Sequence, residues 1–147
     1  MLADTLKTLL ATSYAFVIKA QNFHWNVEGP DFPEYHKFLG DLYEEVYSNA
    51  IDQTAEYIRT LNSYTPGSIR RFSELSQIPD QVKIPRAELM FAELEQDNQK
   101  ILDMWKQAFH VAEEVDEQGI ANFIAERIDA HGKHGWMLRS ILKKDRA

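Results

Sequence analysis

HWNVEGPDFPEYHKFLGDLYEEVYSNAIDQTAE, residues 24–56, holds most of the information in this chain. It contains two histidines twelve residues apart, His24 and His36, with a Gly-Pro turn between them. Asp52 and Glu56 follow four residues apart, so their side chains share one face of a helix. Imidazole and carboxylate together form a ligand set for a first-row metal such as iron. The spacing of these four residues therefore controls whether they can act on one metal ion.

Apolar residues at regular intervals predict long helices on both sides of the turn. Residues 2–26 carry an amphipathic stripe typical of a helix. The stripe consists of Leu2, Leu6, Leu9, Ser13, Phe16, Ala20 and Phe23. The second helix, after the turn, has apolar positions at Phe38, Leu42, Val46, Ile51, Ala55 and Ile58. The step of five residues from Val46 to Ile51 is too long for a regular helix, which predicts a π-bulge or irregular turn between Tyr43 and Ile51.

The rest of the chain predicts two more long helices and a long connection. Residues 62–85 form the connection, which is interrupted by proline and glycine, and a short helix is expected at 68–76. The third and fourth long helices are expected at about 86–113 and 117–142. In the third long helix the apolar positions are Leu89, Leu94, Ile101, Leu102, Trp105 and Phe109. In the fourth they are Ile120, Ile124, Ile128, Trp136, Met137 and Ile141. The sequence predicts an all-α four-helix bundle over 1–147, one domain, with the short helix in the long crossover between helices two and three.

Composition excludes several classes of function. The chain has no cysteine, so it has no disulfide scaffold, no thiolate zinc site and no cysteine nucleophile, and it fits a reducing cytoplasm. Its formal net charge of −7 disfavours binding to nucleic-acid phosphates, which depends on Lys and Arg. No run approaches the ~20 apolar residues that span a bilayer, and the first residues lack the basic start of a signal peptide. We therefore expect a cytoplasmic protein with no membrane partner.

A distance argument separates the two histidines from the two acids. The turn between the first two helices is tight, so His24 and His36 can approach each other. Asp52 lies sixteen residues beyond His36, which is some 24 Å along a helix that rises ~1.5 Å per residue. Two antiparallel copies of the second helix can bring all four residues together, because each copy offers its histidine end to the acidic end of the other. The spacing favours a site shared across a two-fold interface.

HWNVEGPDFPEYHKFLGDLY, followed by DQTAEYIRTL, resembles the signature of the Dps family of miniferritins, and KHGWMLRSIL is also similar to that family. The resemblance implies a ferritin-like fold, a dodecameric shell and ferroxidase activity, in which Fe(II) is oxidised, usually with hydrogen peroxide, and stored as ferric mineral. It implies that His24 and His36 are metal ligands from one subunit and that Asp52 and Glu56 are ligands from its partner. Trp25 matches the tryptophan beside the site. Iron is the expected metal, and zinc is a further divalent metal expected at the same ligands.

One position departs from the family pattern. The family places an aspartate four residues after the second histidine, where this chain has Gly40 followed by Asp41. The gap from His36 to Asp52 is also one residue longer than in the family. If the extra residue precedes Asp41, then Asp41 takes the ligand role. The match at DLY and the core spacing favour a later position for the extra residue. In that case Gly40 occupies the ligand position, and the site lacks one carboxylate. Asp41 then reaches the metal only through bulge geometry or a water molecule. A helical glycine costs roughly 1 kcal/mol relative to alanine, so we expect a close-packing reason for Gly40.

Two alternatives to an active ferroxidase stay open. The first is a DNA-coating protection protein, for which relatives use a Lys-rich N-terminal tail. No such tail is seen here, and the basic group at the other end, Lys143, Lys144 and Arg146, is short, so DNA binding is expected to be weak. The second is a Dps-like shell with an impaired ferroxidase site that sequesters metal, which the departure at Gly40 suggests.

A ferritin-type site inside the bundle is disfavoured by the sequence. That site needs Glu-x-x-His on two helices, and this motif is absent from the chain. Glu126 and Asp129 provide only Glu-x-x-Asp. His110, His131 and His134 lack a complete set of partners, and we expect them at the surface or at an interface.

Overall fold

The computed structural model of the chain describes residues 1–143. The helices are α1 (Leu2–Asn26), α2 (Phe32–Val46), the π-helical turn η1 (Tyr47–Ile51), α3 (Asp52–Thr60), α4 (Ile69–Leu75), α5 (Ala87–Glu114) and α6 (Gln118–Leu142). The described part of the chain contains no strand. It also contains no helix that is both long enough and apolar enough to cross a bilayer. The predicted cations Lys144 and Arg146 lie outside the described residues.

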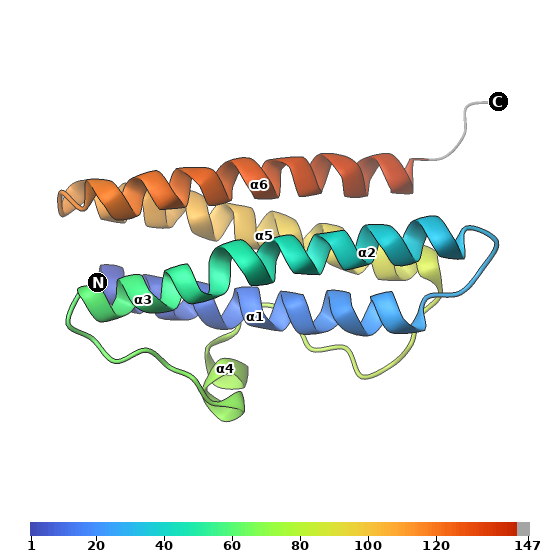
Figure 1. Cartoon of the computed structure of the whole chain (residues 1–147), viewed down its shortest axis with the longest axis horizontal. Helices are drawn as coiled ribbons and strands as arrows, with labels where there is room; N and C mark the ends of the chain where they lie inside the picture. The colour runs from blue at the N-terminus through green and yellow to red at the C-terminus, as the bar shows by residue number, and fades with distance from the viewer. Residues whose placement is uncertain (144–147) are drawn as a thin grey trace.

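Four helical rods lie side by side in the bundle, with α2, η1 and α3 forming one of them (Figure 1). The connection between α3 and α5 runs along the length of the bundle and carries α4, which packs on α1. The predicted all-α bundle, with its short helix in the long crossover, is confirmed.

Helix α1 buries the whole of its predicted stripe, from Leu2 to Phe23. It ends at Asn26, because the next residue, Val27, is extended. Gly29 then takes a φ of +125°, a backbone conformation that residues other than glycine rarely adopt. This turn reverses the chain, so that α2 packs along α1 and the end of one helix meets the beginning of the other.

The second rod contains the irregularity that its apolar spacing predicts. The π-helical turn η1 lies between α2 and α3, and the backbone stays helical on both sides of it. Val46 and Ile51 are both buried although they are five residues apart. The turn therefore absorbs the extra residue, and the predicted bulge is confirmed.

The predicted core of the last two helices is partly wrong. Leu89 and Trp136 were expected in apolar stripes, yet they are 45% and 61% exposed. In α6 the buried face instead includes Arg127, His131 and His134. Apolar spacing missed these positions because their polar groups are buried in partnership with other helices.

We expect the deletion of Ser48, an exposed residue of η1, to be tolerated. It brings Val46 and Ile51 to the regular spacing of four residues, so both side chains stay in the core of a continuous α-helix. The midpoint of thermal unfolding, followed by circular dichroism, should change by no more than about 4 °C, which corresponds to ~1 kcal/mol.

The matched control is the deletion of Lys106, an exposed residue in the regular helix α5. No π-turn compensates there, so the buried residues on one side of the deletion rotate by about 100° relative to those on the other. This variant should lose cooperative unfolding. Equal damage from the two deletions would contradict the role assigned to η1.

Candidate metal site

The two histidines of the opening stretch are locked to each other across the α1–α2 turn. The Nδ1–H of His24 donates to the backbone carbonyl of His36 at 2.6 Å, and the Nδ1–H of His36 donates to that of His24 at 2.7 Å. The rings stack with 3.8 Å between their centroids and 15° between their planes. Because a carbonyl can only accept, Nδ1 carries a proton in both rings, so in the neutral form of each imidazole the lone pair lies on Nε2. This is how second-sphere hydrogen bonds prepare histidines for metal binding.

Neighbouring residues of α2 pack closely around this histidine pair. The ring of Phe32 stacks on His36 at 5.1 Å, and the edge of Tyr43 meets His24 at 5.4 Å. At Gly40, a Cβ atom would lie only 2.9 Å from Cε1 of His24. This approach is the close-packing reason that was expected for the glycine.

The acids expected at the site lie apart from the histidines within one chain. Asp52 and Glu56 are exposed at the beginning of α3, and within residues 1–143 neither carboxylate has a hydrogen-bond or ion-pair partner. Nowhere in the described chain do three or more histidine and acidic side chains gather closely enough to hold a metal ion. Asp41 points into a different interaction, an exposed ion pair of 2.8 Å with Lys37. Its role as a ligand stays a prediction.

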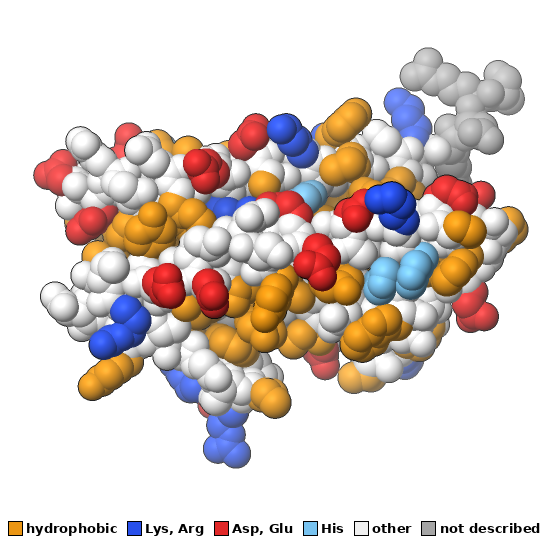
Figure 2. Space-filling view, in the orientation of Figure 1, with side chains coloured by type: hydrophobic (Ala, Val, Ile, Leu, Met, Phe, Trp, Pro, Cys, Tyr) orange, Lys and Arg blue, Asp and Glu red, His pale blue; other side chains and the backbone are white. Residues whose placement is uncertain are grey.

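One face of the molecule carries both halves of the predicted ligand set. Figure 2 shows histidine side chains near the α1–α2 turn, acidic side chains over α3 and hydrophobic side chains between them. Near the middle of α1, Tyr14 stacks on Phe72 of α4 at 4.9 Å and meets the edge of Tyr47 of η1 at 6.3 Å. Trp25, next to His24, is 64% exposed. Histidines and acids thus lie at opposite ends of a partly apolar surface.

A second polar cluster, which residue spacing did not predict, lies inside the bundle. Arg127 of α6 donates two hydrogen bonds to the carboxylate of Glu45 of α2, at 2.7 and 3.0 Å. Nε2 of His134 lies 2.6 Å from the same carboxylate. Burial alone would raise the pKa of Glu45, but the hydrogen bonds and charges of His134 and Arg127 hold that pKa well below its usual range. Glu45 is therefore an anion that ties α2 to α6.

His131 extends this cluster to α5. Its Nδ1–H donates to Oδ1 of Asn98 at 2.8 Å, and Arg127 donates to its Nε2 at 3.3 Å. Burial and, next, the positive charge of Arg127 lower the pKa of His131 well below its ordinary value of 6.5. The neutral ring is thus satisfied on both nitrogens.

The expectation that His131 and His134 lie at the surface or at an interface is wrong, because these partners hold both rings in the core. His110 is exposed, as expected. A signal for the buried pair existed in the sequence. Arg127, His131 and His134 follow Ile124 at intervals of three or four residues, which places them on the buried side of α6.

A buried ion pair also joins α1 to α5. Nζ of Lys19 lies 2.8 Å from Asp97 and 3.9 Å from Glu93. Burial raises the pKa of Asp97, although the hydrogen bond and charge of Lys19 oppose that rise. The cations Arg127 and Lys19 therefore already neutralise the acids of the interior, which leaves those acids unsuited to hold a metal.

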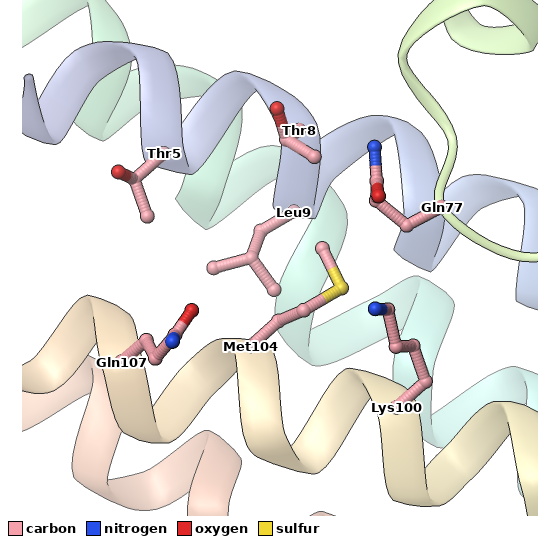
Figure 3. Close-up of a pocket in the computed structure, with 7 residues that line it drawn as sticks. All are labelled: Thr5, Thr8, Leu9, Gln77, Lys100, Met104 and Gln107. Carbon is pink, nitrogen blue, oxygen red and sulfur yellow. The ribbon is translucent and has the colours of Figure 1, made fainter.

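A surface hollow beside α1 does not provide the metal chemistry either. It has a volume of about 260 Å³ and lies between α1, α5 and the connection that follows α4 (Figure 3). Its lining residues are Thr5, Thr8, Leu9, Gln77, Lys100, Met104 and Gln107. None of these is a histidine or an acid, so the candidate metal ligands remain those near the α1–α2 turn and on α3.

Comparison with known proteins gives consistent matches over nearly the whole chain. Residues 3–147 match the ferritin-like domain family. A low temperature-induced protein of Nostoc sp. is 33% identical over 136 residues, which cover 91% of this chain and 75% of that protein. DNA protection during starvation protein 2 of Bacillus anthracis is 29% identical over 141 residues, which cover 96% of each chain.

A solved structure also matches nearly the whole chain. The crystal structure of a Dps protein from Vibrio cholerae O1, described as a member of a broad superfamily of ferritin-like diiron-carboxylate proteins, superposes with a TM-score of 0.92. Its sequence is 26% identical, and the match covers 97% of this chain and 89% of that one. The match therefore spans the bundle as a whole.

The buried His131 makes stability depend on pH. Below about pH 6.5 the unfolded chain binds a proton at this residue that the folded chain excludes, because the folded pKa is lowered. Above that pH neither state is protonated at His131, and the protein keeps its full free energy of unfolding. Below that pH the free energy of unfolding should fall as pH is lowered, by up to ~1.4 kcal/mol per pH unit. Urea unfolding from about pH 8 to about pH 5 measures the slope.

Two variants isolate this group. His131→Gln should be less stable near neutral pH but should show a shallower decline in acid, since it has no ring to protonate. His110→Gln, which replaces an exposed histidine, should keep the wild-type slope. A wild-type slope in the His131→Gln variant would contradict the proposed origin of the acid sensitivity.

Proposed function

The chain belongs to the Dps family of ferritin-like proteins, and on this premise we propose that it oxidises Fe(II) and stores the ferric product. Its ferroxidase reaction uses hydrogen peroxide, and the mineral is held inside a hollow homododecamer. Two Fe(II) ions each lose one electron, the O–O bond of the peroxide breaks, and two protons complete two water molecules. The reaction removes iron and peroxide together in the cytoplasm, which serves iron homeostasis and limits oxidative damage.

The reciprocal hydrogen bonds of His24 and His36 carry this proposal. They commit both Nδ1 atoms to backbone carbonyls and leave both Nε2 atoms available. A histidine that served only to pack the helix end would not need this orientation. Imidazole nitrogen is a good ligand for iron and also for zinc, so zinc is expected to compete at the same position.

A second copy of the chain completes the site. Acidic side chains over α3, where Asp52 and Glu56 are exposed, lie on the same face as the histidine side chains near the α1–α2 turn (Figure 2). A two-fold axis through the apolar middle of that face would bring the acids of each subunit to the histidines of its partner. Trp25 would then pack in the interface. Asp41 is a further candidate ligand if its ion pair with Lys37 opens.

The ligand types suit a ferroxidase. Neutral imidazoles hold Fe(II), while hard anionic carboxylates favour the more highly charged Fe(III). In this proposal Glu56 binds or bridges the iron most tightly, and Asp52 supplies the second negative charge. Together these ligands lower the free energy of the oxidised ion relative to the reduced one, which drives electron transfer to the peroxide.

Gly40 favours a second candidate function. It leaves α2 without a carboxylate at that position, so the site has fewer anionic ligands to stabilise Fe(III). A shell with slow ferroxidation would serve mainly to sequester metal. A role as a DNA-coating protein is proposed to be minor, although relatives are named for DNA protection.

The primary test is iron oxidation in solution. The His24→Ala/Glu56→Ala variant should oxidise Fe(II) with peroxide at least tenfold more slowly than wild type, since lost ligands cost roughly this much or more. Absorbance of the ferric product measures the rate. The matched control is His110→Ala/Glu113→Ala, which removes an exposed histidine and acid from α5 and should leave the rate unchanged. Equal rates for wild type and the first variant would refute the site.

Mixed shells test whether the site is shared. One variant lacks the histidines (His24→Ala/His36→Ala) and the other lacks the acids (Asp52→Ala/Glu56→Ala). Each should be inactive alone. Shells refolded from an equal mixture should regain about a quarter of the wild-type rate, because random pairing rebuilds that share of two-fold sites. No recovery would place the ligands within single chains.

DNA binding should be weak at physiological salt. Each chain contributes a formal charge of −7, so a dodecamer is strongly anionic and repels phosphate. A gel-shift assay at low and at physiological salt measures retention of DNA. Shells that retain DNA at physiological salt would favour the DNA-coating function instead.

A further inference from the structure

We propose that Gly40 is a positioning residue for the metal site. Its missing side chain lets the His24 ring lie against α2 in the orientation that frees Nε2. This inference rests on the proposed function, because it assigns a role to a residue that touches a ligand of that site. Gly40 itself binds nothing.

The contact at Gly40 is a side-chain contact and not a backbone requirement. The φ of Gly40 lies outside the positive range that favours glycine, so other residues can adopt this backbone. A Cβ atom there, however, would lie 2.9 Å from Cε1 and 3.1 Å from Nδ1 of His24. Glycine inside a helix costs about 1 kcal/mol relative to alanine. At position 40 the His24 ring fills the space that a Cβ would need.

The His24 ring cannot move away from position 40 without a change in its orientation. Its Nδ1–H is bound to the carbonyl of His36 at 2.6 Å, and its face rests on the His36 ring. The edge of Tyr43 contacts it from a third direction. A Cβ at position 40 would push the far end of a side chain, which costs folding little. The same movement would break the bond that fixes the Nδ1–H tautomer, so it would cost metal binding much more.

The overlap between position 40 and the His24 ring also determines which ligands the half of the site that contains the histidines can contribute. In the packing of this chain, a Cβ at position 40 would need the volume that the His24 imidazole occupies. With Asp41 bound to Lys37, this half-site contributes neutral nitrogen ligands only. The negative charge at the metal then comes from Asp52 and Glu56 of the other copy.

The test measures metal binding and stability together on assembled, metal-free protein. Co(II) titration followed by visible absorption reports affinity and the ligand field, and Zn(II) calorimetry gives a second affinity. Gly40→Ala should bind both ions 10–100-fold more weakly, with a changed Co(II) spectrum. Its thermal midpoint should be unchanged or higher, because alanine is the better helix former.

Gly132→Ala is the matched control, since it lies within α6 and a Cβ there meets nothing within 4 Å. It should gain up to about 1 kcal/mol of stability and bind metal as wild type does. Gly40→Asp should bind no better than Gly40→Ala. Tighter binding by Gly40→Asp, or wild-type affinity and spectrum in Gly40→Ala, would overturn the proposal.

A double-mutant cycle connects the effect to the ring. In a His24→Ala background, Gly40→Ala should cause no further loss of affinity, because the clashing ring is gone. If Gly40→Ala alone fails to assemble, the double variant should assemble again, and failure of both would overturn the assigned contact. The single variants His24→Ala and Glu56→Ala separate the two proposals. Wild-type affinity in both refutes the metal site itself, whereas their loss with an unaffected Gly40→Ala refutes only the role of Gly40.

Discussion

One extra residue between α2 and α3 constrains the arrangement of this molecule. The π-helical turn η1 absorbs that residue, so Val46 and Ile51 both remain buried. In a regular helix, five residues correspond to about 500° of rotation, and one of the two side chains would leave the core. The turn lets one rod place Glu45 in the interior network on one side while Asp52 and Glu56 stay exposed on the other. Core packing and the acidic half of the candidate site both depend on it.

The charges of the interior explain why the chemistry is proposed for the surface. Glu45 is bound by Arg127, and Asp97 is bound by Lys19, so the half-buried Glu45 and the buried Asp97 each have a protein cation beside them. Removing one partner from such a pair leaves an uncompensated buried charge, which typically costs 3–5 kcal/mol. These acids are therefore committed to holding helices together. Asp52 and Glu56 are not committed in this way, and they remain available to a metal ion and a second copy of the chain.

Much of the fold could be predicted from residue spacing, and the parts that failed share a physical cause. Apolar periodicity identified the buried face of α1 and the extra residue before Ile51, because local spacing alone determines both. It misjudged Trp136 and missed the buried His131, since the partner of His131, Asn98, is thirty-three residues away. The contact of Gly40 with His24 likewise depends on how two helices pack. The approach of His24 to His36 was predictable from the short turn, whereas the proposed meeting of histidines and acids would involve a second chain.

Several features of the proposed interface weaken an isolated chain. Gly40 costs its helix about 1 kcal/mol, and the like charges of Asp52 and Glu56, four residues apart, cost a few tenths more. Trp25 exposes a large apolar ring beside His24. A cation between the acids would convert their repulsion into attraction, and a second copy would bury the exposed ring. Features that are unfavourable one by one in the single chain would thus become favourable together in the proposed complex with a metal ion and a partner, which is the behaviour expected of a shared site.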